Sequence, residues 1–449
     1  MTLLSHSIGR IAMPSKPFAF SRRNFVLGGT ALLATPWIVR AAYAGPLDCI
    51  VVGAGVAGLS AARTLQAAGA SFVVLEARDR IGGRAWTHDA ALGLPFDRGA
   101  QWLHAYDDNP FADIAQAMGR ATRPSPIEDM RVLKDGVPVP DGAERLEAGA
   151  GRLEWSLGWR SLVQGDFSFG SVPDADEWAG AAERLAAFTM ATDPHRLSVD
   201  DYITFADGED RMVQSGLGRL IADWGRDVPV RLGHTVSRIA WDDGGAVTVS
   251  GDWGSMTART AIVTVPTGVL RDGRIDFVPE LPNRTLAAIE ALPMGRFMKI
   301  GLRLDAPLRG VPEYAFDIAR ANRGKAVGLH VHSSLPLVTA IVAGDHAREV
   351  ARMDERERIA HATNALRDAF GATHPAIVAH DHYDWSADPF ALGAYSVRAL
   401  GADDARADYS RPVADRLFLA GDAAQEPHPI SVAAAHDAGA EAAQTVLSR

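Results

Sequence analysis

The chain has 449 residues, and its 47% hydrophobic and 22% charged content is typical of a folded globular protein rather than a disordered one. Residues 1–44 hold five basic residues and no acidic one. The remainder therefore has 40 basic against 55 acidic residues, a net charge of −15 that disfavours nucleic acid as a partner. No run reaches the ~20 apolar residues that a membrane-spanning helix needs, and a single cysteine, Cys49, excludes an internal disulfide.

The first 44 residues have the features of an export signal. Arg22 and Arg23 precede an apolar segment at 25–39, and the small residues "AYA" follow at 42–44. A basic region, a short apolar region and a small-residue cleavage site in this order predict a signal peptide over residues 1–44. The paired arginines resemble the signal of the twin-arginine route, which exports folded proteins, so we expect a periplasmic location. An uncleaved anchor or a chance basic patch is the alternative.

A dinucleotide-binding pattern follows directly. The predicted order is a strand at 50–52, the glycines Gly53, Gly55 and Gly58, a helix that Gly69 ends, a strand at 72–75 and then Glu76. In a Rossmann βαβ unit the glycines allow the backbone and the helix N-terminus to approach a pyrophosphate, and the carboxylate binds ribose hydroxyls. The strand, the helix and the acid 23 residues after the first glycine satisfy the structural context of this motif. A glycine-rich turn without a ligand is the alternative.

The segment "EARDRIGGR" adds Arg78, Arg80 and Arg84 around Gly82 and Gly83. The glycine pattern by itself does not distinguish FAD from NAD. Fixed positive charge at this place suits a second phosphate. A solvated arginine cluster is the alternative.

Five later segments show a clear periodicity: helices at 176–191, 354–371 and 432–447, and strand-like alternation at 246–265 and 292–304. The alternation at 246–265 predicts an antiparallel layer beside the Rossmann sheet. The helix at 354–371 is expected to end at Gly371. The positive N-terminal end of the helix at 432–447 could face an electron-rich ring.

Lys299 is a lone charge in the apolar run "LPMGRFMKIGLRL", and it is one of only four lysines in the chain. A buried ammonium is tolerated only with partners, so this position indicates a functional site. The alternative is a side chain that extends along the strand to solvent.

Two H-x-H pairs, at 330–332 and 380–382, place histidines on one face of a strand. No third ligand is fixed by spacing, so we expect strand histidines and no metal site.

Cys49 lies in an apolar strand and is interpreted as a core residue.

From Cys49 to the C-terminus the chain resembles the flavin-containing amine oxidase family, which includes monoamine oxidases, polyamine oxidases and flavin histone demethylases. The matching segments are "EARDRIGGR", "FDRGAQWLH", "HTVSRI", "AIVTVPTGVL", "LPMGRFMKIGL", "DWSADPFALGAYS" and "LFLAGDAAQ". The resemblance implies a Rossmann-type FAD-binding domain interleaved with an α+β substrate domain. We place the first at 46–104, 212–296 and 386–449, and the second at 105–211 and 297–385.

The resemblance also implies the residues that hold the cofactor. They are Gly53, Gly55, Gly58, Glu76, Arg78, Gly83, Arg84, Gln101, Trp102, Val236, Gly421, Asp422 and Val432. In the family, members of this set contact the adenosine ribose, the pyrophosphate, the adenine and the ring system. Ala394 stands where some members attach flavin through cysteine, so we expect non-covalent FAD.

The same resemblance assigns Lys299 to the family lysine that reaches flavin N5 through a water. Trp385 and Tyr395 match the tryptophan beside the flavin and the first wall of an aromatic cage, which suits a cationic amine. Ser431 stands at the second wall, so a double-tyrosine cage is not expected. His104, with Asp107 and Asp108 nearby, is interpreted as a contact for a cationic substrate, and an ordinary surface loop is the alternative.

These features predict oxidation of an amine, with a polyamine, secondary or cyclic amine favoured, by hydride transfer to flavin N5. Oxygen, a cytochrome or a quinone is the expected electron acceptor. The alternatives within the fold are a desaturase or porphyrinogen-type oxidase, and an L-amino-acid oxidase, which the missing arginine in "GAQWLH" disfavours. A non-catalytic flavin redox-partner protein is the alternative of another class.

Overall fold

A strand–helix–strand unit opens the part of the chain that the computed structural model describes, which comprises residues 47–164, 166–171, 176–205, 208–241, 245–424 and 430–449. β1 (Leu47–Val52) and β2 (Phe72–Leu75) pair in parallel, and α1 (Val56–Ala67) connects them. Gly69 follows the helix at a φ of 72°, which glycine adopts without steric cost. This is the unit predicted from the glycine motif. The signal peptide predicted for residues 1–44 lies outside the described residues.

The first sheet joins β1 and β2 to strands from much later in the chain. The described residues give the order β10–β2–β1–β13–β12–β11–β14, with β20 also paired to β13. The added strands are β10 (Val230–Arg231), β11 (Arg238–Ala240), β12 (Val247–Gly251), β13 (Gly254–Val263), β14 (Asp276–Val278) and β20 (Leu417–Leu419).

The antiparallel layer expected beside this sheet is instead an extension of it. The first half of β13 pairs antiparallel with β12, and its second half pairs in parallel with β1 and β20. A strand of ten residues is long enough to belong to both parts. The alternation at 246–265 therefore predicted the two strands correctly. It did not predict that both strands belong to the same sheet as β1 and β2.

Both faces of the first sheet are buried, which explains the continuous apolar run of β1. Cys49 and Val51 face α1 and α13 (Val432–Leu447), and Ile50 and Val52 face the side of α8 (Asn283–Ala291) and α12 (Ala405–Ser410). Burial raises the pKa of the Cys49 thiol to about 12, in keeping with a core residue.

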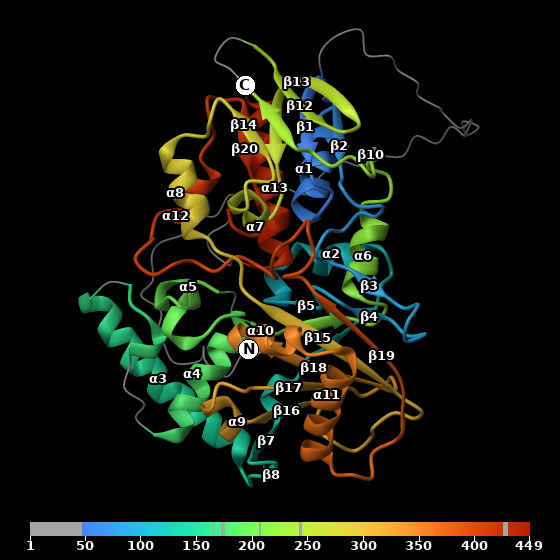
Figure 1. The fold of residues 1–449 in the computed structure, drawn as a ribbon, viewed down its shortest axis with the longest axis vertical. Helices are drawn as coiled ribbons and strands as arrows, with labels where there is room; N and C mark the ends of the chain where they lie inside the picture. Colours follow the sequence, from blue (N-terminus) through green and yellow to red (C-terminus); the bar gives the residue numbers. More distant parts are fainter. Residues whose placement is uncertain (1–46, 165, 172–175, 206–207, 242–244, 425–429) are drawn as a thin grey trace, which may run out of the picture.

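The second sheet lies below the first in Figure 1 and has the order β19–β15–β18–β17–β16–β7–β8. Its strands are β7 (Arg131–Lys134), β8 (Val137–Pro138), β15 (Phe297–Leu304), β16 (Tyr314–Asp317), β17 (Gly328–His332), β18 (Leu337–Ala343) and β19 (Ile377–Asp384). α10 (Gly344–Arg352) and α11 (Glu355–Phe370) pack on one face of it. α11 begins with a capping box at Asp354 and ends at Gly371, as expected.

Strand periodicity decides which way Lys299 points. On β15, Met298, Ile300 and Leu302 pack in the core beneath α10 and α11. Successive side chains of a strand point to opposite faces. Phe297 and Lys299 therefore lie on the other face of the sheet, and both line the cavity described below.

The strands of the two sheets come from different segments of the interleaved domain prediction, and the division into domains itself stays a prediction. Every strand of the first sheet comes from residues 46–104, 212–296 or 386–449, and every strand of the second comes from 105–211 or 297–385, among the described residues. The exact boundaries remain a prediction.

Smaller elements complete the described structure. Two short sheets contain β3 (Thr87–His88) with β4 (Phe96–Asp97), and β5 (Trp102–Leu103) with β9 (Arg211–Val213) and β6 (Thr122–Pro124). The remaining α-helices are α2 (Pro110–Ala117), α3 (Gly142–Gln164), α4 (Glu177–Thr189), α5 (Val199–Ile203), α6 (Leu217–Trp224), α7 (Thr267–Arg271) and α9 (Ile318–Asn322). Single 3-10 turns lie at Tyr106–Asp108, Ile127–Asp129, Phe169–Ser171 and Pro194–Arg196.

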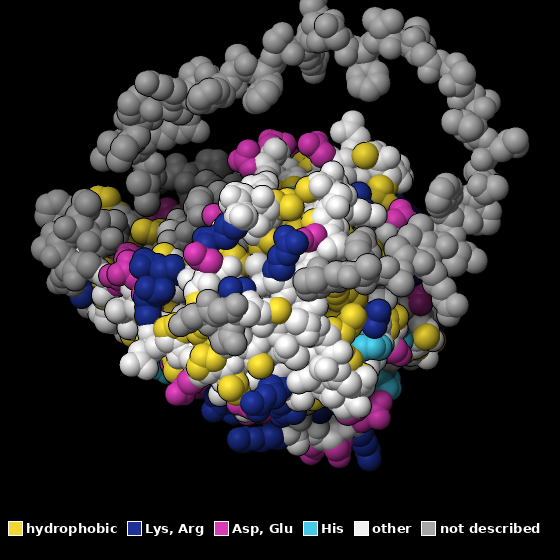
Figure 2. All heavy atoms as spheres, turned by 90° about the horizontal axis from the view of Figure 1, so that it is seen from above, with side chains coloured by type: hydrophobic (Ala, Val, Ile, Leu, Met, Phe, Trp, Pro, Cys, Tyr) yellow, Lys and Arg dark blue, Asp and Glu magenta, His cyan; other side chains and the backbone are white. Residues whose placement is uncertain are grey.

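The face seen in Figure 2 intersperses basic, acidic and hydrophobic side chains. Many exposed arginines elsewhere on the described surface pair with a nearby carboxylate, as Arg274 does with Asp272 and Arg271 with Glu290. Among the described residues, no helix is both long and apolar enough to cross a membrane.

Candidate active site

A cavity of about 390 Å³ runs from the glycine loop of the first sheet to the face of the second sheet that carries Lys299. It brings together residues that are up to about 380 positions apart in sequence. The sequence-predicted residues that line it are Gly53, Gly55, Glu76, Arg78, Gly83, Arg84, Gln101, Trp102, His104, Val236, Lys299, Trp385, Tyr395, Gly421, Asp422, Ser431 and Val432. Gly58 was also predicted to bind cofactor, and it does not line the cavity.

The first and third glycines of the motif serve the backbone and its packing. Gly53 has a φ of 102°, in the left-handed region that favours glycine. A Cβ on Gly58 would lie 1.9 Å from the carbonyl oxygen of Gly53, so this glycine permits α1 to approach the loop closely. A Cβ on Gly55 would meet only the Cα of Gly83, at 3.9 Å.

Glu76 is held at the end of β2 by two backbone amides. One carboxylate oxygen accepts from the N–H of Ala54 at 2.7 Å, and the other accepts from the N–H of Arg78 at 2.9 Å. Each oxygen keeps a lone pair for a further donor, such as a hydroxyl group. The guanidinium of Arg78 is paired with Asp388 at 2.8 Å and is not free in this arrangement.

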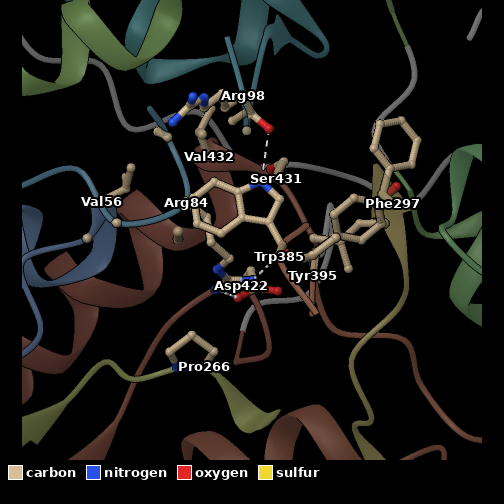
Figure 3. A pocket seen from close by; sticks show the side chains of 18 of the residues that line it. Val56, Arg84, Arg98, Pro266, Phe297, Trp385, Tyr395, Asp422, Ser431 and Val432 are labelled. Carbon is tan, nitrogen blue, oxygen red and sulfur yellow. Dashed lines mark hydrogen bonds and ion pairs between the residues drawn. The ribbon is translucent and has the colours of Figure 1, made fainter. Parts of the chain in front are cut away.

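Arg84 joins the N-terminal and C-terminal parts of the site. Its guanidinium donates to the carboxylate of Asp422 at 2.5 Å and to the carbonyl of Ala394 at 2.8 Å, as Figure 3 shows in part. The other oxygen of Asp422 accepts from the N–H of Ser396 at 2.9 Å. Burial acts to raise the pKa of Asp422, but Arg84, the N–H of Ser396 and the charge of Arg406 together hold that pKa below its usual value.

Lys299 does not extend to solvent, because its side chain is buried and its ammonium has three acceptors. The Nζ donates to the carbonyl of Gly99 at 2.7 Å, to the amide oxygen of Gln101 at 2.8 Å and to the carbonyl of Asp97 at 3.2 Å. It also lies 4.7 Å from the centre of the Trp102 ring. Burial lowers the pKa of Lys299 to about 7, although the nearby charge of Asp97 acts to raise it.

Aromatic rings line the cavity near Lys299. The indole N–H of Trp385 donates to the carbonyl of Arg98 at 2.9 Å, and the hydroxyl of Tyr395 donates to the carbonyl of Thr189 at 2.5 Å. These bonds fix both rings. Phe297 lies beside Tyr395, with ring centres 6.0 Å apart, and Figure 3 shows the two rings next to each other on one side of the cavity.

Ser431 is the N-cap of α13, and its hydroxyl accepts from the N–H of Ala434 at 3.0 Å. α13 has no acidic residue in its first turn, so its positive end reaches the cavity at Val432 without a neutralising charge.

His104 lies in the cavity wall, but its acidic partner is not one of those expected. Asp107 and Asp108 are exposed and do not line the cavity. The Nδ1 of His104 lies 3.0 Å from both carboxylate oxygens of Asp210, which does line it. Burial acts to raise the pKa of Asp210, but opposing contributions, of which those of His104 are the largest and the N–H of Ala105 is another, lower that pKa overall.

Sequence reasoning missed several residues of the substrate end of the cavity. They are Ser125, Ile127, Phe188, Phe205, Asp210, Phe297 and Tyr314. Phe297 was within reach, because it shares strand parity with Lys299. Asp210 gave no signal, since 106 residues separate it from His104 and β5 meets β9 only in the folded chain.

The H-x-H pairs are strand histidines. His330 and His332 lie on β17, and their ring centres are 4.1 Å apart. No cluster of three or more possible metal ligands occurs in the described part of the chain.

A parallel sheet with a glycine loop, an acid at the end of its second strand and a cavity that continues into a second domain defines a nucleotide-cofactor oxidoreductase. The chain belongs to the family of flavin containing amine oxidoreductases, whose family model matches residues 56–185 and 195–447. It is thus a flavin-dependent enzyme that acts on amines.

Two curated relatives and two solved structures illustrate the similarity. The chain is 30% identical to polyamine oxidase 5 of Oryza sativa subsp. japonica, over 89% of this chain and 88% of that protein. It is 29% identical to a probable polyamine oxidase 4 of Arabidopsis thaliana, over 88% and 86%. Its fold is similar to that of putrescine oxidase bound to putrescine, with a TM-score of 0.76, 20% identity and coverage of 90% and 99%. It is also similar to that of cyclohexylamine oxidase from Brevibacterium oxydans IH-35A, with a TM-score of 0.73, 22% identity and coverage of 90% and 100%.

The residues present fit a flavin dinucleotide. The N-cap of α1, Gly55, makes no side-chain cap, and the first turn holds no acid, so the donors at that helix end remain available to a phosphate. A Cβ on Gly421, whose φ is 141°, would meet no atom within 4 Å and would project into open space in the cavity wall. Both glycines leave room for a group that approaches the backbone closely.

Proposed function

We propose that the chain oxidises an amine at the carbon bonded to nitrogen, with non-covalent FAD as the group that accepts hydride from that carbon. The resulting imine takes up water and gives a carbonyl compound and an amine or ammonia. A polyamine, a secondary amine or a cyclic amine is the favoured substrate. The observation that carries the proposal is one cavity that is lined by a dinucleotide-type loop, by Lys299, by aromatic rings and by the Asp210–His104 pair.

The chain's own residues would divide the binding of FAD among them. Glu76 would accept hydrogen bonds from the adenosine ribose, and the N-terminus of α1 would face the pyrophosphate. Val236 lies in the cavity wall next to Thr235 and His234, where the adenine is expected. Arg84 and Asp422, with the N-terminus of α13, would hold the other half. FAD supplies the two-electron chemistry, and the protein supplies position and field.

Several features of the substrate end support a cationic substrate with apolar parts. The rings of Phe205, Phe297 and Tyr395 offer faces to an ammonium and to methylene groups. Asp210, kept ionised beside His104, supplies negative charge. The small Ser431 widens the chamber and so admits secondary and cyclic amines.

The alternatives are less well supported by the chamber. An α-amino acid substrate calls for a cation to bind its carboxylate. The lining arginines Arg78, Arg84, Arg98 and Arg274 come from the segments assigned to the cofactor domain. Lys299, which lines the cavity from the other segment, already donates to three acceptors. A desaturase or porphyrinogen-type oxidase would act on an apolar substrate, and the Asp210–His104 pair has no part in such a reaction. A redox-partner protein without turnover needs no chamber.

The deciding experiment is anaerobic stopped-flow mixing of the yellow protein with a panel of amines while flavin absorbance is followed. Bleaching by a polyamine, a secondary amine or a cyclic amine would support the proposal. Bleaching only by α-amino acids, or turnover of a carotenoid-type substrate without any amine activity, would establish an alternative. A stable flavin spectrum with every amine would contradict the proposal.

Two further proposals complete this function. Ala394 carries no nucleophile, so acid precipitation should release the flavin into the supernatant, and flavin that stays with the precipitate would contradict non-covalent binding.

We also propose export through the twin-arginine route, with oxygen, a cytochrome or a quinone as electron acceptor. Fractionation of cells that express the full chain, with Arg22→Lys and Arg23→Lys as the control, tests the location, and periplasmic activity that survives both changes would contradict it.

A further inference from the structure

Behind Lys299, a chain of hydrogen bonds leads away from the cavity. The amide oxygen of Gln101 accepts from Lys299 at 2.8 Å, and the amide nitrogen lies 2.9 Å from the Nδ1 of His330. His330 is fully buried on β17 and does not line the cavity. Its ring stacks on that of Tyr314, with centres 4.7 Å apart and an interplanar angle of 9°. Its Nε2 has no hydrogen-bond partner among the described residues.

The direction of this chain follows from which groups can donate. An ammonium has three donors and no acceptor, and Lys299 meets three acceptors: two backbone carbonyls and the oxygen of Gln101. Gln101 must therefore turn its oxygen to Lys299 and its NH₂ group to the other side. That NH₂ group lies 3.3 Å from the sulfur of Met212, which can only accept, so the same orientation is favoured twice.

The orientation of Gln101 fixes the protonation of His330. The NH₂ group is a donor, so Nδ1 must be the acceptor, and the single proton of a neutral ring must sit on Nε2. A protonated His330 would present an N–H to the NH₂ group and would drive the amide to turn, which would place its NH₂ against the ammonium. We propose that His330 is a positioning residue: its neutral, Nε2-protonated ring holds Gln101 so that the amide oxygen faces the ammonium of Lys299.

Burial and the charges around the hydrogen-bonded residues favour the neutral ring of His330. The titratable groups that face it are Asp97 on β4, Arg123 on β6, Tyr314 on β16 and His332 on β17. Burial lowers the pKa of His330 well below its usual value, and the charges of His332, Arg123 and Lys299 lower it further. The buried Nε2–H of His330 has no partner among the described residues, which is unfavourable, and an apolar residue at this position would avoid that cost. What the histidine provides, and an apolar residue would not, is the acceptor Nδ1 for Gln101.

The value of this positioning rests on the function proposed for Lys299, but its first test does not depend on turnover. Long-range nitrogen–proton NMR of histidine-labelled holoenzyme distinguishes the two tautomers from the charged ring. The signals that disappear in His330→Asn belong to His330. We expect an unprotonated Nδ1 and a protonated Nε2 at neutral pH. A protonated Nδ1, in either the neutral or the charged ring, would overturn the proposal even if the protein oxidises amines.

The second test measures Lys299 directly. The chain has four lysines, so lysine labelled with ¹³C at Cε gives few signals, and Lys299→Met assigns the one of interest. His330→Leu removes the acceptor for Gln101, so the Lys299 titration should move down by about one pH unit, the size of one weakened hydrogen bond to a charge. His330→Asn, whose Oδ1 can replace Nδ1, should restore most of the shift.

His332→Leu is the matched control, because His332 lies on the same strand as His330 but bonds to Thr339 rather than to Gln101. We expect it to leave the Lys299 titration in place. Equal titrations in wild type and His330→Leu, or an equal shift in His332→Leu, would overturn the positioning role. If His330→Leu does not fold, the tautomer measurement on the wild-type protein still decides. Failure to oxidise any amine would contradict the proposed function alone.

Discussion

Arg84 and Asp422, 338 positions apart in sequence, form an ion pair of 2.5 Å that joins the loop after the first βαβ unit to the segment before the last helix. Asp422 also accepts from the backbone of Ser396, so three separate segments meet at this carboxylate. The pair lines the cavity proposed for the cofactor, so we expect its loss to affect both the packing of these segments and the binding of the cofactor.

Asp422→Asn keeps the shape of the side chain but removes its charge. Arg84 would lose its ionic partner, and we expect a lower unfolding temperature and purification with less FAD. The cost should be about 2 kcal/mol, below the ~3–5 kcal/mol of a fully buried pair, because the Arg84 side chain is 22% exposed. Thermal unfolding and the ratio of flavin to protein absorbance measure both effects. Asp276→Asn, which breaks the exposed pair with Arg238, should change neither, and equal effects in the two variants would refute this assignment.

Lys299→Met replaces the ammonium with a chain of similar size. If the ammonium assists the reaction of the reduced flavin with oxygen, the variant should reoxidise its flavin roughly 100-fold more slowly, the effect typical of a positioned proton-transfer group. FAD content should change little, since the Nζ of Lys299 already donates to Asp97, Gly99 and Gln101 and lies against the Trp102 ring among the described residues. Double-mixing stopped flow measures the rate, and an unchanged rate would remove this role.

The protonation of Lys299 should also appear in the pH dependence of stability. Its folded pKa of about 7 lies below its usual value of 10.5, so between these values the unfolded chain binds a proton that the folded chain lacks. Stability from this group therefore rises with pH from about 7 to 10.5 and is constant below and above. The difference in unfolding free energy between wild type and Lys299→Met should grow in favour of wild type over that window. A difference that does not vary with pH would place the folded pKa near its usual value.

Gly55 and Gly58 belong to one motif but should respond differently to alanine. A Cβ at Gly58 would overlap the carbonyl of Gly53, so Gly58→Ala should cost more than about 2 kcal/mol of stability. Gly55 has a φ of −73°, which alanine adopts freely, and its Cβ would enter the cavity. Gly55→Ala should fold normally and bind FAD weakly, as judged by circular dichroism and flavin titration. Normal flavin affinity in Gly55→Ala would exclude the pyrophosphate from this place.

Asp210→Asn tests the cationic substrate. Removing the charge should raise KM for a diamine by about tenfold, equivalent to about 1.4 kcal/mol, and should affect a monoamine less. Asp107→Asn serves as the control, because Asp107 is exposed and lies off the cavity. If both substrates respond equally to Asp210→Asn, the carboxylate does not bind a second ammonium.

Local patterns in the sequence predicted the elements well where one period or one motif specifies them. The glycine motif predicted β1, α1 and β2, and the helices at 354–371 and 432–447 correspond to α11 and α13. Lys299 was recognised because a lone charge in an apolar strand is rare. The role of Gly58 and the partner of His104 were not predicted, since both depend on which backbone or carboxylate comes within about 3 Å.

The sequence by itself determined the strand and helix periods, the dinucleotide loop and the presence of a lone lysine in an apolar strand, because each of these depends on neighbours along the chain. Only the tertiary structure decided that β13 joins both parts of one sheet, that Asp210 faces His104 and that Gln101 connects Lys299 to His330. Hydrogen bonds and charges act over a few ångströms in space. Residues that are 106 or 229 positions apart acquire their partners only when the sheets have packed.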